Sequence, residues 1–183
     1  MRVSKIHTNL STNYLVEQND KVLLIDCSCE LEVLQKLTPK LDAIVVTHGH
    51  FDHFATLEQI QKHYDCPVYM HGEAYAKLAS PKLNASDGFE EQIVCHLPQD
   101  VAKFVTEGKQ DIAGIEAKIF FAPGHTNDSI MVAIDTALFV GDFLFEHGYG
   151  RTDLPTGSFT VMKQSLRKYL SVIKNYTLFY GHE

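Results

Sequence analysis

Short apolar runs alternate with amphipathic segments along this chain. The apolar runs are rich in Val, Ile, Phe and Tyr, so we expect β-strands at 13–17, 22–26, 43–47, 67–70, 115–122, 129–134, 137–142 and 177–181. Helical periodicity between them predicts helices at 30–37, 55–64, 73–79 and 159–174. Strands mixed with helices favour an α/β layered architecture over an all-β barrel.

The last predicted helix, 159–174, is the longest. Its apolar residues recur at helical spacing and are expected to share one buried face: Phe159, Met162, Leu166, Tyr169, Leu170 and Ile173. Ser158 precedes the first of them and is predicted to be the N-cap, because its hydroxyl can accept a backbone hydrogen bond from the first turn.

Length and charge limit the classes of partner. A chain of 183 residues without a Pro/Gly linker suits a single domain, 1–183. The formal net charge is −7 and no basic run is present, so we expect no nucleic-acid partner. The N-terminus lacks a continuous apolar segment and no run could span a bilayer, which predicts a cytoplasmic protein without a membrane partner. The oligomeric state stays open.

Four cysteines, Cys27, Cys29, Cys66 and Cys95, are spread over the first half of the chain. The pair Cys27 and Cys29 invites a metal-site interpretation. Zinc sites built on thiols use a second thiol pair, however, and none follows. In a chain of this size without an export signal we expect all four to be ordinary reduced thiols.

Residues of the type that binds metals follow four of the expected strands. The segment THGHFDH (47–53) ends the strand at 43–47, and PGH (123–125), GD (141–142) and GH (181–182) follow three others. Loops at strand ends on a rigid sheet let side chains converge without disturbing the core. The candidate ligands are His48, His50, Asp52, His53, His125, Asp142 and His182.

The chemistry of this set favours two metal ions. Imidazole and carboxylate suit zinc, and also iron or manganese. One zinc takes three or four ligands, so seven groups suit two divalent metals that share a carboxylate. Such a pair lowers the pKa of a bound water and polarises a carbonyl or phosphoryl oxygen. Two dications also offset part of the acidic net charge, so an anionic small substrate stays possible.

The ordered motifs LLID, THGHFDH, PGHT, VGD and YGH resemble those of the metallo-β-lactamase superfamily, from about residue 6 to the end of the chain. The segments PGHTNDS (123–129), GDFLF (141–145) and GRTDLP (150–155) are most similar to its glyoxalase II-like branch. The resemblance implies a four-layer αββα sandwich, with the metals at one edge of the paired sheets.

The resemblance also implies a role for each residue. His48, His50 and His125 would hold one metal, and a second would be held by Asp52, His53 and His182. Asp142 would bridge the two, and Asp26 would orient a ligand imidazole. Asp52 and Asp142 are the residues expected to take direct part in catalysis. Zinc is the first expectation for both metals, with iron or manganese as alternatives.

Three features depart from the family pattern. Cys27-Ser28 follows LLID where relatives have a glycine-containing turn. There is no room for the C-terminal helical domain with which glyoxalase II binds glutathione. The chain also stops at Glu183, one residue after His182, so we expect either that the gene product continues or that the second site is partly occupied.

The function implied by the resemblance is hydrolysis of a small-molecule thioester or ester through a metal-bound hydroxide. The alternative is a persulfide dioxygenase with one iron held by His48, His125 and Asp142. β-Lactam hydrolysis is disfavoured, because the authentic zinc enzymes carry Cys where Asp142 stands. Substrate-binding residues stay unassigned: His147 is expected to be exposed, and Arg151 and Asp153 could bind a substrate carboxylate or pair with each other.

Overall fold

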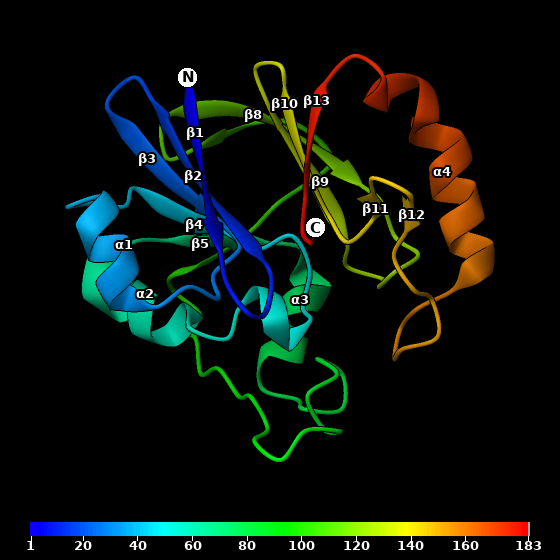
Figure 1. The fold of residues 1–183 in the computed structure, drawn as a ribbon, viewed down its shortest axis with the longest axis horizontal. Helices are drawn as coiled ribbons and strands as arrows, with labels where there is room; N and C mark the ends of the chain where they lie inside the picture. The colour runs from blue at the N-terminus through cyan, green and yellow to red at the C-terminus, as the bar shows by residue number, and fades with distance from the viewer. Residues whose placement is uncertain (183) are drawn as a thin grey trace.

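Two β-sheets stacked face to face form the centre of the computed structural model, which describes residues 1–182 (Figure 1). The first sheet has six strands in chain order: β1 (Arg2–His7), β2 (Thr12–Gln18), β3 (Lys21–Ile25), β4 (Ala43–Val45), β5 (Val68–Met70) and β6 (Ala102–Phe104). Strands β1 to β3 are antiparallel, whereas β3 to β6 run parallel. The parallel strands therefore end at one common edge of this sheet.

The second sheet has five strands in the order β13-β10-β9-β8-β7. Their bounds are β7 (Gly108–Ile112), β8 (Ile115–Phe121), β9 (Ile130–Ile134), β10 (Ala137–Gly141) and β13 (Thr177–Tyr180). A small hairpin, β11 (Leu144–Phe145) with β12 (Gly148–Tyr149), follows β10. The pair β10 and β13 is parallel, so both strands deliver the residues that follow them to one edge.

Helices cover the outer faces of both sheets (Figure 1). α1 (Leu31–Leu37), α2 (Leu57–Tyr64) and α3 (Gly72–Leu78) lie on the first sheet, and α4 (Phe159–Ile173) lies on the second. The layer order is thus helix, sheet, sheet, helix. This confirms the predicted αββα sandwich.

Alternation along the strands produces these layers, because successive side chains of a strand point to opposite faces. In β8, Ile115, Ala117 and Ile119 face the cluster between the two sheets. Phe120, between them and the strand end, instead packs with Met162 of α4. One strand therefore contributes to two cores: its four buried residues are all apolar, whereas Glu116 and Lys118 are exposed.

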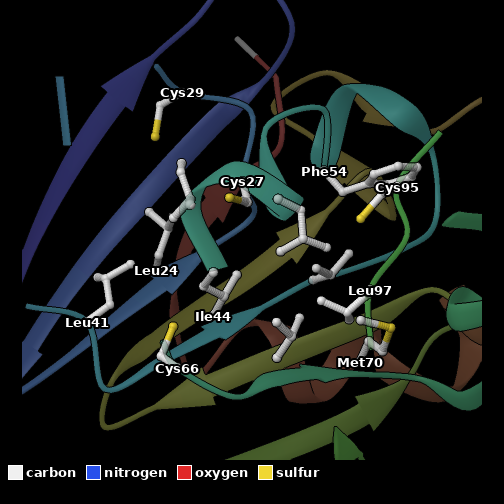
Figure 2. Close-up of a cluster of buried hydrophobic side chains, with 14 of the residues drawn as sticks. Leu24, Cys27, Cys29, Leu41, Ile44, Phe54, Cys66, Met70, Cys95 and Leu97 are labelled. Atoms are coloured by element: carbon white, nitrogen blue, oxygen red, sulfur yellow. The ribbon is translucent and has the colours of Figure 1, made fainter. Parts of the chain in front are cut away.

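The four cysteines belong to the core between the first sheet and its helices. Figure 2 shows their sulfur atoms dispersed among Leu24, Ile44, Phe54 and other apolar side chains. Burial raises the pKa of Cys66 and of Cys95 to about 12, which keeps both as thiols at neutral pH. Within residues 1–182, no cysteine belongs to a cluster that could hold a metal ion.

Two predictions about elements need correction. The apolar face of α4 is narrower than its sequence predicts: Met162 and Tyr169 are buried, but Phe159 and Leu170 are about half exposed. They lie to one side of the buried stripe that contains Met162, Tyr169 and Ile173. Five strands were not predicted, because each has at most one buried residue and therefore no apolar run: β1, β6, β7, β11 and β12. The predicted N-cap is confirmed, since the Ser158 hydroxyl accepts the Val161 N–H.

In the part of the chain that the structure describes, no helix combines the length and the apolar character needed to cross a membrane.

Candidate metal centre

The strand ends of both sheets meet at one edge of the sandwich and bring all seven predicted ligands together. THGHFDH follows β4 and contains the short 3₁₀ helix Phe51–His53. The other ligands follow β8, β10 and β13. Side-chain ligand atoms lie within 4.8 Å of one another in three overlapping groups: His48–His50–His125, His48–His53–Asp142 and Asp52–His53–His182. Their role as ligands stays a prediction, but their convergence is a feature of the fold.

Three buried imidazoles, His48, His50 and His125, form what we call site one. Nδ1 of His50 lies 2.9 Å from Nε2 of His125. Nδ1 of His125 donates to the carbonyl of Arg151 at 2.7 Å, which leaves Nε2 of that ring free to act as a lone-pair donor. Nε2 of His48 is buried with no hydrogen-bond partner, a costly arrangement for a polar atom. These donors fit a divalent metal that accepts imidazole nitrogen.

Asp52, His53 and His182 form what we call site two. Nε2 of His182 lies 3.2 Å from Oδ2 of Asp52 and 3.3 Å from Nε2 of His53. His53 is fully buried, whereas the His182 side chain is 32% exposed. Site two is therefore the more open half of the cluster.

Asp142 lies between the two sites. Its Oδ1 is 3.2 Å from Nε2 of His53, and its Oδ2 is 3.4 Å from Nε2 of His182 and 3.6 Å from Nε2 of His125. Oδ1 has no hydrogen-bond partner although it is buried. One carboxylate thus faces ligand atoms of both sites, which is the geometry that a bridging ligand requires.

The lack of a side chain at Gly181 allows the Asp142 carboxylate and the His53 ring to lie close to this backbone. A Cβ at that position would collide with Oδ1 of Asp142 and lie 2.7 Å from Cε1 of His53. The backbone of Gly181 is held on both sides, because its carbonyl accepts the Thr12 N–H at 2.7 Å and its N–H donates to Gly141 at 3.0 Å. The backbone immediately before His182 is therefore fixed to both sheets. Glu183 lies outside the described residues.

Asp26 contacts the buried imidazole of His53, a candidate ligand of the kind that the family resemblance expects it to orient. Its Oδ2 lies 2.7 Å from Nδ1 of His53, and its two oxygens also accept the N–H and hydroxyl of Thr47 at 2.8 and 2.9 Å. An N–H at Nδ1 leaves Nε2 of His53 as the nitrogen that faces Asp142. Asp26 itself adopts a left-handed φ of 59°, so the unusual Cys27-Ser28 turn starts from a residue type that tolerates this conformation.

Site one favours neutral imidazoles. Burial, helped by the nearby His53, lowers the pKa of His48 well below its ordinary value. Burial and the neighbouring His125 lower the pKa of His50 to about 3. The pKa of His125 is also lowered by burial. The three rings therefore offer unprotonated nitrogens at neutral pH, which is the form that binds metals.

Site two favours ion pairs. Burial opposes a charge on His53, but Asp142, Asp26 and Asp52 surround it and hold its pKa well above the ordinary value. Hydrogen bonds to Asp142 and Asp52 raise the pKa of His182 to about 9. In turn His53 and His182 hold the pKa of Asp142 well below its usual range, although burial acts in the opposite direction. Acidic and basic members of this site thus balance one another.

A buried polar network behind site two was missed by the sequence analysis. The Ser11 hydroxyl donates to the carbonyl of Asp52 at 2.7 Å and contacts the Ser28 hydroxyl at 2.8 Å. Asn13 accepts the Ser28 N–H at 2.9 Å. The network thereby ties the ligand loop to β2. The one available signal was a polar Asn13 inside an apolar strand, which is too common to identify a role.

The residues left unassigned near the site are exposed. Arg151 and Asp153 form a two-point ion pair, with N–O distances of 2.8 and 2.7 Å. The pairing alternative is therefore the one that the structure contains. His147 lies in the turn of the β11–β12 hairpin and is exposed, as predicted.

Comparison with known proteins agrees with the family resemblance of the sequence motifs. The family model for the metallo-beta-lactamase superfamily matches residues 9–182. A protein named probable metallo-hydrolase YqgX, from Bacillus subtilis (strain 168), is 31% identical over 97% of this chain and 85% of its own length. A hydroxyacylglutathione hydrolase from Rhodopseudomonas palustris (strain HaA2) is 34% identical over 84% of this chain, but the match covers 52% of that enzyme.

Two solved structures share the fold over the whole chain. The BLEG-1 B3 metallo-beta-lactamase has a TM-score of 0.90 at 26% identity, over 92% of that chain. TTHA1623 in a di-iron-bound form has a TM-score of 0.85 at 27% identity, also over 92% of that chain. Proteins of this superfamily generally bind two metal ions, which agrees with the His/Asp cluster. The chain therefore belongs to the metallo-β-lactamase superfamily, in its glyoxalase II-like metallo-hydrolase branch.

Proposed function

We propose that this chain hydrolyses a small acyl thioester or ester with two divalent metals, one held at site one and one at site two. The observation that carries the proposal is the convergence of six candidate ligand side chains around Asp142, with buried nitrogen and oxygen atoms that no protein group satisfies. Unsatisfied buried polar atoms are rare in folded proteins, and a cation would satisfy these.

The named relatives support the thioester as the substrate class. The hydroxyacylglutathione hydrolase named above cleaves, as its name states, an acyl derivative of glutathione. This chain matches 52% of that enzyme, so glutathione recognition is not part of the proposal. The thioester is proposed for this chain because the superfamily model matches residues 9–182, which contain all seven candidate ligands.

Bound divalent metals would supply an activated water and positive charge for the oxyanion that forms during acyl transfer. The chain's own residues prepare the site for this chemistry. Asp26 fixes the ring of His53 through Nδ1, and the carbonyl of Arg151 fixes the ring of His125 in the same way. The ligand rings therefore need little reorganisation when a metal arrives.

The two carboxylates have different positions and different tasks. Asp142 is 9% exposed and faces both sites, so its charge balances the two cations. The Asp52 side chain is 21% exposed and lies on the open side next to His182. Its carboxylate can accept the proton that the attacking water releases and pass it to the leaving thiolate.

The rival dioxygenase would need only His48, His125 and Asp142. The geometry favours the two-metal hydrolase, because site two has three further ligand groups within 4.8 Å of one another. We propose zinc as the first choice for both sites. The di-iron form of TTHA1623 makes iron the alternative that must be measured.

The test starts with metal-free protein prepared by chelation. Hydrolysis of a small acyl thioester should be absent and should return with zinc, manganese or ferrous iron, as measured by thiol release. Elemental analysis of protein purified without added metal should give about two metals per chain. His48→Ala should abolish turnover, whereas the matched control His96→Ala, at an exposed position, should not.

Turnover that survives complete metal removal would refute the proposal. One iron per chain, with oxygen consumption on a persulfide substrate, would establish the dioxygenase instead. A β-lactam substrate belongs in the same assay, because the BLEG-1 structure shares the fold; faster β-lactam than thioester hydrolysis would overturn the substrate class.

A further inference from the structure

A buried ion pair lies directly behind the ligand loop of site one. Lys77, on α3, is 2% exposed and Asp128 is fully buried, and Nζ of Lys77 contacts Oδ1 of Asp128. The second oxygen of Asp128 accepts the N–H of Gly49 at 2.7 Å. Nζ of Lys77 also donates to the Thr156 hydroxyl at 2.8 Å. Both charged groups therefore have well-defined partners.

Gly49 connects the buried ion pair to site one. Gly49 lies between His48 and His50, two ligands of site one, and Asp128 lies three residues after the third, His125. One hydrogen bond therefore connects the two loops that supply site one. Since an imidazole moves with its backbone, fixing Gly49 relative to Asp128 fixes the separation of the rings.

Lys77 fills the space that a side chain at position 49 would need. A Cβ on Gly49 would lie 2.8 Å from Cδ and 2.9 Å from Cβ of Lys77, and 3.1 Å from Oδ2 of Asp128. The lysine stem thus packs against the ligand loop while its ammonium group neutralises Asp128. The loop is held by a packing contact and a hydrogen bond at the same residue.

Stability alone does not account for such a pair. Desolvation of a buried lysine and a buried carboxylate offsets most of their attraction, and apolar replacements are often neutral or stabilising. A charge-assisted hydrogen bond to a backbone N–H, in contrast, is short and directional. It sets the position of the backbone more strictly than apolar packing does.

We propose that Lys77 and Asp128 are positioning residues for site one, acting through the Asp128–Gly49 hydrogen bond on the spacing of His48, His50 and His125. The inference rests on the metal-binding part of the proposed function and not on its substrate. Substitutions that remove the acceptor for the Gly49 N–H should lower metal affinity at site one while the fold stays intact.

Two double variants isolate the acceptor. Lys77→Met with Asp128→Asn removes both charges but keeps an oxygen that can accept from Gly49. Lys77→Met with Asp128→Leu removes both charges and the acceptor. Neither leaves an unpaired buried charge, so both should fold, and their melting temperatures verify this. Cobalt binding is measured by competition with a chromophoric chelator, without any substrate.

The Asn double variant should bind cobalt within about threefold of the wild type. The Leu double variant should lose about 10–100-fold at one metal equivalent, the range typical when a group that orients a ligand is removed. Its cobalt d–d spectrum should also change, because the ring geometry changes. The matched control is Asp42→Asn, because Asp42 likewise accepts a lysine and a backbone N–H, at 2.8 and 2.9 Å, but is not part of the metal-binding cluster.

Equal cobalt affinity and spectra in the two double variants would overturn the proposal and leave the pair with a purely structural role. A similar loss in Asp42→Asn would also overturn it, because the effect would then be general destabilisation. If the wild type binds two cobalt ions but hydrolyses no thioester, the proposed function fails while the positioning role is still decided by these variants. If the wild type binds no cobalt, both fail.

Discussion

Site one and site two have the same number of unshared candidate ligands but opposite electrostatic properties. The residues of site one are at most 3% exposed and are neutral imidazoles, because burial holds their pKa values below the ordinary range. Site two contains Asp52 beside His53 and His182, whose pKa values are raised by the surrounding carboxylates. Its His182 side chain is 32% exposed.

The two sites differ in whether protons must leave before a cation can bind. Site one offers free nitrogen lone pairs, so a metal there displaces no proton at neutral pH. In site two the surrounding carboxylates raise the pKa values of His53 and His182, so a metal must displace protons from these rings before it gains them as ligands. We therefore expect site one to fill first and to exchange slowly, and site two to fill second and to depend on pH.

The largest expected effect comes from the residue that the two sites share. Asp142→Asn keeps the side-chain volume but removes the charge that balances both cations. Affinity at both sites should fall by more than about 100-fold, because removing a partner of a ligand already costs 10–100-fold. Metal content and cobalt competition measure the loss. Asp135→Asn is the control, since Asp135 is exposed in the β9–β10 turn.

Loss of only one metal in Asp142→Asn, with thioester hydrolysis intact, would show that Asp142 does not bridge. The contrast between the sites would then be one of two independent centres, and the single-iron alternative would gain support.

A smaller and selective effect is expected when one ligand is removed from each site. His182→Ala should leave about one metal per chain, because site one keeps all three imidazoles. His125→Ala removes a nitrogen from the site that fills first, so the tighter affinity should be lost. Both variants should lack thioester hydrolysis. Titration with cobalt, followed by its visible spectrum, separates the two cases.

The reverse outcome, in which His182→Ala removes the tighter equivalent, would show that the open, ion-paired site dominates metal binding. Exposure and protonation would then be poor guides to the order of filling.

Much of the fold and of the metal cluster could be predicted from the sequence because both depend on local patterns. Strand ends supply the candidate ligands, so an apolar run followed by His or Asp indicates a residue's place before the topology is known. The short β4 shows how this works: three buried residues, 43–45, suffice to aim THGHFDH at the sheet edge. The same runs predict an α/β layered fold, whereas the αββα order was implied by the family resemblance.

Contacts between distant segments could not be predicted in this way. In the sequence, nothing distinguishes Lys77 from other lysines of the predicted helices. Its contacts with Gly49 and Asp128 appear only in the folded structure. The Ser11 hydroxyl reaches the carbonyl of Asp52 across 41 positions of sequence for the same reason. Phe159 and Leu170 show the opposite error, because helical periodicity places apolar residues on one stripe but does not reveal which of them the rest of the fold covers.

The smallest expected effect is the pH dependence of metal affinity at site two. His182 has a pKa of about 9, so at pH 7 nearly all molecules carry a proton there in the metal-free protein. A metal at site two must displace that proton. Affinity at site two should therefore rise about tenfold per pH unit, for each proton displaced, as pH increases towards 9, and the contribution of His182 should level off above it.

The same argument predicts that metal affinity at site one depends very little on pH near neutrality, because the pKa of His50 is about 3 and those of His48 and His125 are lowered. Calorimetric titration in two buffers of different ionisation enthalpy counts the protons released with each equivalent. We expect almost no proton release with the first metal equivalent, and release of one or more protons with the second. His182→Ala should remove the proton-releasing event together with the second metal. Proton release with the first equivalent would mean that site one is protonated in solution, and the electrostatic contrast between the two sites would then be wrong.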